Sequence, residues 1–230
     1  MRHYNQYRMS ILITGASGGL GGAVVEAFLR TGATVYGATL AWKNQPHSNP
    51  KFIPLEADLL QAAECDRVAK AASPVDALVH LVGGIAGGQS VAETSDATWN
   101  QMLDLNLRSA YSMFRSVLPE MIKSGRGRIL TVGSRAVEQP FANYAAYTVS
   151  KAALVTLVKS VAVEVKDSGI TANVVLPSVI DTPANRVAMA TGDPSKRVTP
   201  ESIAGLLVWL ASDAARDING ASIPIYGKMW

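Results

Sequence analysis

The sequence has almost no cysteine: Cys65 is the only one among 230 residues. A single cysteine cannot form a disulfide bond within the chain, so a small disulfide-stapled fold is excluded. A reducing compartment such as the cytoplasm fits this composition, and we expect Cys65 to be a packed helix residue rather than a nucleophile. We also expect no metal site.

Long apolar runs and clustered charges are absent as well. No apolar segment reaches the ~18 residues that a membrane-spanning helix needs, so we expect no membrane partner. None follows the basic start MRHYNQYRMS before glycines interrupt it, so we expect no signal peptide. The net charge is only +3 and the basic residues are scattered, which argues against a nucleic-acid partner.

What the sequence does contain is 48% hydrophobic residues, enough to bury a full core. Short runs that are apolar throughout alternate with longer helical patterns, which is typical of parallel strands covered by helices on both faces. We therefore predict one α/β domain over residues 1–230, with a doubly wound, Rossmann-like parallel sheet of seven strands and residues 1–8 as a flexible extension.

The predicted elements follow from these runs. The predicted strands cover residues 11–14, 34–38, 52–55, 77–82, 128–132, 172–176 and 222–226. The predicted helices cover residues 20–30, 60–72, 97–123, 143–167 and 200–212, two of them opened by the start signals Ser95 and Pro200. Residues 39–51 hold two prolines and two asparagines without a helical period, so we expect an irregular loop there.

A glycine-rich segment, TGASGGLGGAVVEAFLRTG, runs from Thr14 directly after the first predicted strand. Glycine clusters also serve ordinary tight turns, but here strand, glycines and amphipathic helix occur together in the first βα unit. Glycines let the backbone approach a pyrophosphate closely, and a helix N-terminus offers unpaired N–H groups and a positive dipole end. The segment therefore predicts a dinucleotide site.

A second pattern is the stretch AAYTVSKAAL, in which Tyr147 and Lys151 are four positions apart and so share one helix face. The pair is either an ordinary surface contact or a phenol beside a cation, which would ionise more easily than a free phenol with a pKa near ~10. These residues alone leave both interpretations open.

The glycine spacing is TGxxxGxG, and together with Tyr147 and Lys151 it resembles the short-chain dehydrogenase/reductase family. The resemblance covers nearly the whole chain, with several motifs in the family's order. These motifs are the loop from Thr14 to Gly21, Asp58 and Leu59, Asn106, Ser134, YTVSK at 147–151, and LPSVIDTP at 176–183.

The resemblance implies hydride transfer between a nicotinamide coenzyme and a small or medium carbonyl or alcohol substrate. Tyr147 would be the acid/base, Lys151 would lower the tyrosine's pKa and hold the nicotinamide ribose, and Ser134 would position the substrate oxygen. Asn106 would support a water that links Lys151 to solvent. Taken singly, Tyr147, Ser134 and Asn106 could each be structural.

The resemblance also implies the coenzyme contacts. Asp58 would accept a hydrogen bond from the adenine amino group, although it could instead cap the following helix. Ile180 and Thr182 would reach the nicotinamide carboxamide. The coenzyme-binding residues that we expect are Thr14, Gly15, Ser17, Gly19, Leu20, Gly21, Thr39, Asp58, Leu59, Val82, Gly83, Tyr147, Lys151, Pro177, Ile180 and Thr182.

An acidic residue is missing at the end of the second predicted strand, where folds that select NAD usually bind the ribose 2′-hydroxyl, about 20 residues past the glycines. Thr39 stands there, and no Asp or Glu occurs between Glu26 and Glu56. A 2′-phosphate would meet no fixed repulsion and could pair with Lys43, although no arginine is placed to clamp it. We therefore expect NADP(H) in preference to NAD(H).

The sequence departs from the family's pattern at two places. Ser178 replaces the usual glycine after Pro177, and His80 begins a HLVG stretch where Asn-Asn-Ala-Gly is common. We expect His80 to be a satisfied strand histidine. VGGIAGG with DTPANR resembles the dihydropteridine reductase branch, which makes a quinonoid pterin an alternative substrate, but that branch generally lacks the serine and asparagine that this chain keeps. A dinucleotide-binding redox sensor without turnover and a sugar-nucleotide epimerase are further alternatives.

The substrate pocket should lie beside the catalytic residues and under a lid at about 183–199. Its expected lining residues are Ile85, Arg135, Ala136, Phe141 and Tyr144. Arg135 could bind a substrate carboxylate, but a solvent-facing arginine is the default interpretation. The helices at 97–123 and 143–167 carry apolar residues around much of their circumference, so we expect a homo-oligomer, a tetramer before a dimer.

Overall fold

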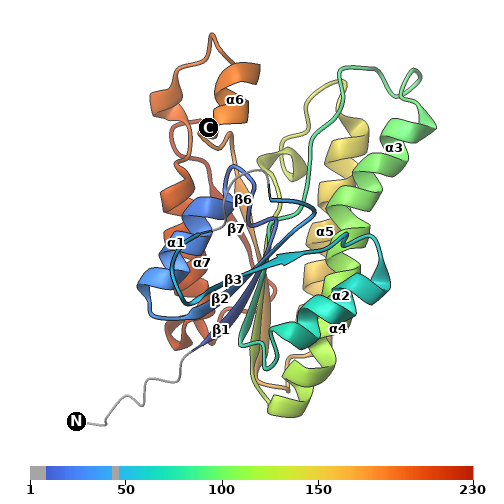
Figure 1. The fold of residues 1–230 in the computed structure, drawn as a ribbon. Coiled ribbons are helices and arrows are strands. Elements are labelled where there is room, and N and C mark those ends of the chain that lie inside the picture. The colour runs from blue at the N-terminus through green and yellow to red at the C-terminus, as the bar shows by residue number, and fades with distance from the viewer. Residues whose placement is uncertain (1–8, 43–46, 230) are drawn as a thin grey trace.

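Seven parallel strands form one sheet at the centre of the computed structural model, which describes residues 9–42 and 47–229 (Figure 1). The strands are β1 (Ser10–Thr14), β2 (Thr34–Thr39), β3 (Phe52–Glu56), β4 (Ala77–His80), β5 (Gly127–Val132), β6 (Ile170–Pro177) and β7 (Ser222–Ile225). Each predicted strand is present, so the predicted doubly wound sheet is confirmed. The flexible extension predicted at residues 1–8 lies outside the described residues.

The strand order is β3-β2-β1-β4-β5-β6-β7. The chain winds outward from β1 to β3 and then returns to place β4 on the other side of β1, where Thr14 is in register with both Ala38 of β2 and His80 of β4. Ligands of doubly wound folds bind at the carboxyl ends of the strands at such a reversal. The glycine loop after β1 and the segment after β4 therefore meet at the expected ligand edge.

Helices cover both faces of the sheet (Figure 1). Helices α1 (Gly21–Arg30) and α7 (Pro200–Ala211) pack together on one face, and α2 (Ala62–Ala71), α4 (Ser109–Ser124) and α5 (Ala145–Glu164) lie on the other. Each face has its own apolar core. Cys65 of α2 is fully buried in one of these cores, as predicted.

The predicted helix at 97–123 is interrupted in its hydrogen-bond pattern. It begins with α3 (Asp96–Leu103), capped by Ser95 Oγ, which accepts the N–H of Thr98, and it continues as α4 to Ser124. Between them, Asp104–Arg108 form a π-helical segment. The apolar periodicity did not predict this segment, although such segments occur often at functional sites.

Burial on both faces holds for the inner strands and fails at the two edges. Every residue of β4 and β6 is buried, whereas the edge strands β3 and β7 are partly exposed. Each edge strand carries an exposed proline, Pro54 or Pro224, which an edge tolerates because it lacks one neighbouring strand. Coverage by helices on both faces is therefore complete for β4 and β6 and incomplete for the two edge strands.

The crossover from β2 to β3 contains no helix in its described part, which confirms the irregular loop. Trp42 packs edge to face on Phe52, with ring centroids 5.6 Å apart, and its backbone N–H donates to Glu56.

The lid, for which we predicted no element, contains helix α6 (Pro183–Ala188). Asp181 fixes its base by ion pairs of 2.7 Å to Arg186 and 3.5 Å to Arg197.

Helix α5 is long and apolar enough to cross a membrane by length and composition alone, a test that core helices of folded domains also pass. Its inner face is part of the core, with Leu154 and Val158 fully buried. On its outer side Val149 is 44% and Val163 67% exposed. Packing against the sheet accounts for the apolar composition of the inner face only.

Candidate active site

The glycine loop makes a tight turn against the segment that follows β4. Gly15 has a φ of +71°, and a Cβ there would lie 3.0 Å from backbone atoms of Leu81 and Val82. A Cβ on Gly21 would lie only 2.4 Å from the carbonyl oxygens of Gly15 and Ala16. Backbone atoms cannot move aside cheaply, so this loop geometry requires glycine at both positions.

The loop leads into the N-terminus of α1 at Leu20 and Gly21. No side chain caps this end, and its first turn carries no acidic residue. The Gly21 N–H donates to the carbonyl of Gly18 at 3.0 Å, so the positive end of the helix dipole and the N–H groups that follow Gly21 are the ones that fit the pyrophosphate of a dinucleotide. The start of the lid lies against the same loop, since a Cβ on Gly19 would be 3.0 Å from the side chain of Thr182.

The predicted adenine and ribose contacts lie at the ends of β2 and β3. The hydroxyls of Ser17 and Thr39 are hydrogen-bonded at 2.6 Å. Asp58 Oδ1 accepts the N–H of Leu60 at 3.0 Å, so this oxygen stabilises the turn before α2, while Leu59 is buried in the core. The adenine role of Asp58 stays a prediction, and Lys43 lies outside the described residues.

The structure brings the predicted catalytic residues together at the carboxyl edge of the sheet. Helix α5 carries Tyr147 and Lys151, and the Ser134 hydroxyl lies within hydrogen-bonding reach of the Tyr147 hydroxyl and acts to lower its pKa. Ser134 follows β5 and accepts the N–H of Ala136, which fixes the turn that starts there. Lys151 Nζ donates to the carbonyl of Val132 at 2.9 Å.

Asn106 lies in the π-helical segment and is fully buried. Its Oδ1 accepts the N–H of Gly84 at 3.0 Å, and its Nδ2 donates to the carbonyl of Gly84 at 3.0 Å and to Ser150 Oγ at 3.0 Å. A Cβ on Gly83 would lie 2.7 Å from Asn106 Oδ1 and 3.0 Å from Lys151 Nζ. Asn106 and Lys151 therefore converge on a point where only glycine fits.

The pKa values of Tyr147 and Lys151 differ from our expectation for this pair. Burial lowers the pKa of Lys151 from 10.5 to about 8. Burial also raises the pKa of Tyr147, and the hydrogen bond with Ser134 only partly opposes this effect. The prediction of a lowered tyrosine pKa is therefore wrong for this arrangement. The loss of hydration destabilises the phenolate more than the interaction with Ser134 stabilises it.

The buried ammonium of Lys151 should cost stability while it is charged. The difference between 10.5 and about 8 corresponds to roughly 3 kcal/mol, more than the ~1 kcal/mol of its hydrogen bond. The folded state binds the proton less tightly, so this cost is complete below pH 8 and is relieved as pH rises toward 10.5. We expect Lys151→Met to increase the free energy of unfolding at pH 7, by an amount that shrinks toward pH 10.

Urea denaturation between pH 7 and pH 10 measures this difference. Lys159→Met removes an exposed lysine from the same helix and should change stability little at any pH. A Lys151→Met protein that is less stable than the wild type at pH 7, by an amount independent of pH, would contradict the assignment of Lys151 as a costly buried charge.

His80 is a satisfied strand histidine, as predicted. Its Nδ1 lies 2.9 Å from Thr14 Oγ1 and its Nε2 3.2 Å from Ser109 Oγ. Burial, with a smaller effect of the Lys151 charge, lowers its pKa to about 3, so it is neutral at physiological pH.

Sequence reasoning missed three contacts around the site. Ser150 bridges Asn106 and the carbonyl of Tyr147; its place inside YTVSK was the available signal. Ser178, which replaces a glycine of the family pattern, donates to the carbonyl of Tyr226 at 2.8 Å and so ties the strand end to the C-terminal segment. The default of a solvent-facing Arg135 is wrong, since this half-buried side chain donates to a backbone carbonyl of that segment and lies over the Tyr226 ring.

The expected substrate side of Tyr147 is aromatic. The Phe141 ring centroid lies 4.9 Å from that of Tyr144 and 6.4 Å from that of Tyr147, and Phe141 is 45% exposed. A Cβ on Gly87 would be 2.4 Å from the Tyr144 ring, so the loop after β4 packs closely on this group. Ile85 in the same loop is exposed, and Ala136 is buried.

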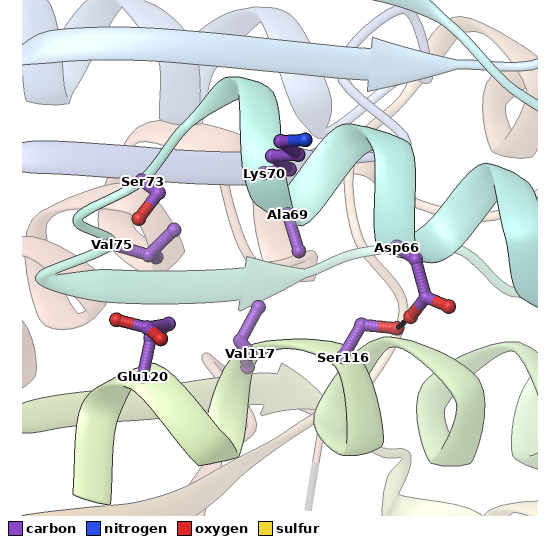
Figure 2. A pocket seen from close by; sticks show the side chains of 8 residues that line it. All are labelled: Asp66, Ala69, Lys70, Ser73, Val75, Ser116, Val117 and Glu120. Atoms are coloured by element: carbon purple, nitrogen blue, oxygen red, sulfur yellow. Dashed lines mark hydrogen bonds between the residues drawn. The ribbon is translucent and has the colours of Figure 1, made fainter. Parts of the chain in front are cut away.

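A separate groove of about 240 Å³ lies between α2 and α4 (Figure 2). Side chains of the two helices face each other across it, and Ser116 donates to Asp66 at 2.6 Å. The lining residues are Asp66, Ala69, Lys70, Ser73, Val75, Ser116, Val117 and Glu120. None of them belongs to the predicted site.

Known proteins resemble this chain in sequence and in fold. A family model described as short chain dehydrogenase matches residues 9–192. The short-chain dehydrogenase/reductase olcF of Penicillium canescens is 32% identical over an alignment that covers 94% of each chain. The 3-oxoacyl-acyl-carrier-protein reductase FabG of Vibrio harveyi is 31% identical over an alignment that covers 95% of this chain and 96% of that protein.

Among solved structures, an oxidoreductase of the same family from Burkholderia thailandensis is similar with a TM-score of 0.86 at 32% identity. The match covers 96% of this chain and 92% of that one. The family match therefore extends over most of the sequence and over the fold as a whole. The chain belongs to the short-chain dehydrogenase/reductase family.

Proposed function

We propose that this protein interconverts a small or medium carbonyl compound and its alcohol, with Tyr147 as the acid/base. Membership of the family makes the chain a nicotinamide-dependent oxidoreductase that acts on CH–OH or C=O groups. The observation that carries the proposal is the Ser134 hydroxyl within hydrogen-bonding reach of Tyr147 at the ligand edge, one helical turn from the buried Lys151. Two hydroxyls that can both donate then face one substrate oxygen.

The roles follow from the side chains. A bound nicotinamide coenzyme would supply or accept the hydride. Tyr147 holds its proton because burial raises its pKa, so it is in the form that donates to a carbonyl oxygen during reduction. Ser134 provides a second hydrogen bond to that oxygen. Lys151, with a pKa of about 8, exchanges protons near neutral pH and has two further N–H donors for ribose hydroxyls.

The other candidate functions are less well supported. A redox sensor without turnover has no chemical need for Ser134, Tyr147 and Lys151 together. A pterin reductase of the branch that VGGIAGG resembles would generally lack the serine and the asparagine, and both are present in the site.

The proposal is tested by a panel of carbonyls and alcohols, including a quinonoid pterin, assayed with both coenzymes. Turnover of simple carbonyls supports it. Turnover of the pterin alone would replace it with the pterin reductase, and coenzyme binding without any turnover would replace it with the sensor.

We also propose that NADP(H) is preferred. The described part of the β2 end carries no acid, and the Thr39 hydroxyl is paired with Ser17. We expect a higher kcat/KM with NADPH than with NADH. Thr39→Asp should reverse the preference, lowering kcat/KM with NADPH at least ~10-fold by repulsion of the 2′-phosphate, whereas Thr39→Asn, of equal size and neutral, should not. Equal or better efficiency of the wild type with NADH would overturn the preference.

Assembly and location are part of the same proposal. Tyr111 on α4 and Val149 and Val163 on α5 are exposed on the helices that we expect to form a shared bundle, so we propose a homo-oligomer, a tetramer before a dimer. A monomeric mass by light scattering at micromolar concentration would reject the homo-oligomer.

The single buried thiol agrees with a cytoplasmic location, which cell fractionation tests.

A further inference from the structure

A chain of buried polar groups runs beneath the active site and is not explained by the proposed mechanism. His80 Nδ1 is paired with the hydroxyl of Thr14, and His80 Nε2 with the hydroxyl of Ser109. The Ser109 hydroxyl in turn donates to the carbonyl of Leu105 at 2.7 Å, inside the π-helical segment. Thr14, His80 and Ser109 are at most 1% exposed. Groups this deeply buried are out of reach of bulk solvent, so each depends on its partner.

The direction of each hydrogen bond follows from proton counting. The single proton of the Ser109 hydroxyl is directed at the Leu105 carbonyl, so the oxygen of Ser109 can only accept from His80. Nε2 of the neutral imidazole therefore carries the proton. Nδ1 then has a lone pair and accepts the hydroxyl proton of Thr14. The chain runs without a break from Thr14 through His80 and Ser109 to Leu105.

The two ends of this chain belong to the two halves of the site. Thr14 begins the glycine loop, whose residue Gly15 packs on the segment after β4. Leu105 precedes Asn106, whose side chain accepts the N–H of Gly84. Asn106 and Lys151 both lie against the neighbouring Gly83. The histidine ring links these elements because its two nitrogens point in different directions, Nδ1 toward Thr14 and Nε2 toward Ser109.

We propose that His80 is a positioning residue that holds the glycine loop and the π-helical segment in register, so that coenzyme binding and the Asn106–Lys151 end of the site are coupled. This inference rests on the proposed function for its effect on turnover. His80 is fully buried, so in this proposal it acts through the hydroxyls of Thr14 and Ser109.

The first test needs no activity. Nitrogen-15 NMR of labelled histidine reports which ring nitrogen carries the proton, and we expect the Nε2–H form for His80 at neutral pH. Ser109→Ala removes the acceptor of this proton and should shift His80 toward the Nδ1–H form, which can donate to Thr14. Thr14→Val removes the other partner and should leave the Nε2–H form in place. A wild-type His80 in the Nδ1–H form would overturn the proposal.

The second test measures the coupling. Ser109→Ala and Thr14→Val should each lower kcat about 5- to 10-fold, and the double variant should lose no more than the worse single variant, because either change already breaks the chain. Losses that multiply would show independent sites and overturn the proposal. Ser109→Thr keeps the hydroxyl and should restore kcat. Ser112→Ala, a buried serine of the same helix outside the chain, is the matched control.

The third measurement separates this inference from the proposed function. Hydrogen exchange of the amides of residues 104–109 should slow when NADPH binds to the wild type and should respond less in Thr14→Val, at NADPH concentrations that saturate both proteins. If the wild type showed no turnover but its exchange still slowed with NADPH more than that of Thr14→Val, the proposed function would be rejected and the coupling retained. An equal response in both proteins would reject the coupling, whatever the activity.

Discussion

Replacing Tyr147 with phenylalanine is expected to lower kcat by at least ~10²-fold, within the ~10² to 10⁴ that general acid/base catalysis contributes. The substitution removes the proton donor and one hydrogen bond to the developing oxyanion, while the ring stays packed beside Phe141. Coenzyme affinity should stay within about twofold of the wild type, because the phenol acts on the substrate oxygen. Steady-state kinetics with a carbonyl from the panel and direct coenzyme titration measure the two effects.

The pH profile gives a second readout of Tyr147. Oxidation of the alcohol needs the ionised phenol, so its rate should rise with pH, with an apparent pKa that belongs to Tyr147 and Lys151 together. This rise should vanish in Tyr147→Phe. Tyr111→Phe, at an exposed tyrosine of α4, is the matched control and should keep both rate and profile. Near-normal turnover by Tyr147→Phe would remove Tyr147 from the mechanism.

Replacing Gly21 with alanine is expected to have the largest effect on coenzyme binding. The added Cβ would lie 2.4 Å from two loop carbonyl oxygens, so the turn must open. Overpacking of this kind costs ~1 to 3 kcal/mol, and it moves the N–H groups that would hold the pyrophosphate. We expect the coenzyme Kd to increase at least ~10-fold, which corresponds to ~1.4 kcal/mol. Fluorescence titration with NADPH measures it.

The neighbouring Gly22 is the matched control for this prediction. A Cβ there meets nothing within 4 Å, and the position is an exposed one inside α1. Gly22→Ala should leave Kd unchanged and stabilise the helix by up to ~1 kcal/mol, since alanine has the higher helix propensity. If both variants bound NADPH like the wild type, the glycine loop would be an ordinary turn and the coenzyme site would lie elsewhere.

The chemistry of the site was only partly predictable. The spacing of Tyr147 and Lys151 placed them on one helix face, and the structure does so. The sign of the tyrosine's pKa shift was not predictable, because it depends on how much water burial removes from the phenolate. The surroundings of Arg135 were missed for a similar reason: its partners Tyr226 and Met229 are some 90 positions away in the sequence.

By itself the sequence determined the elements and their order. Apolar runs, glycines and caps such as Ser95 act through neighbours in the chain, so the seven strands and the glycine turn could be predicted from local patterns. Only the tertiary structure decided which groups meet at the ligand edge. The pairing of Asn106 with Gly84 and the link from Thr14 through His80 to Ser109 join residues distant in sequence. Such contacts form because buried polar groups must find partners once the sheet and helices have packed, and local periodicity carries no information about which partners those are.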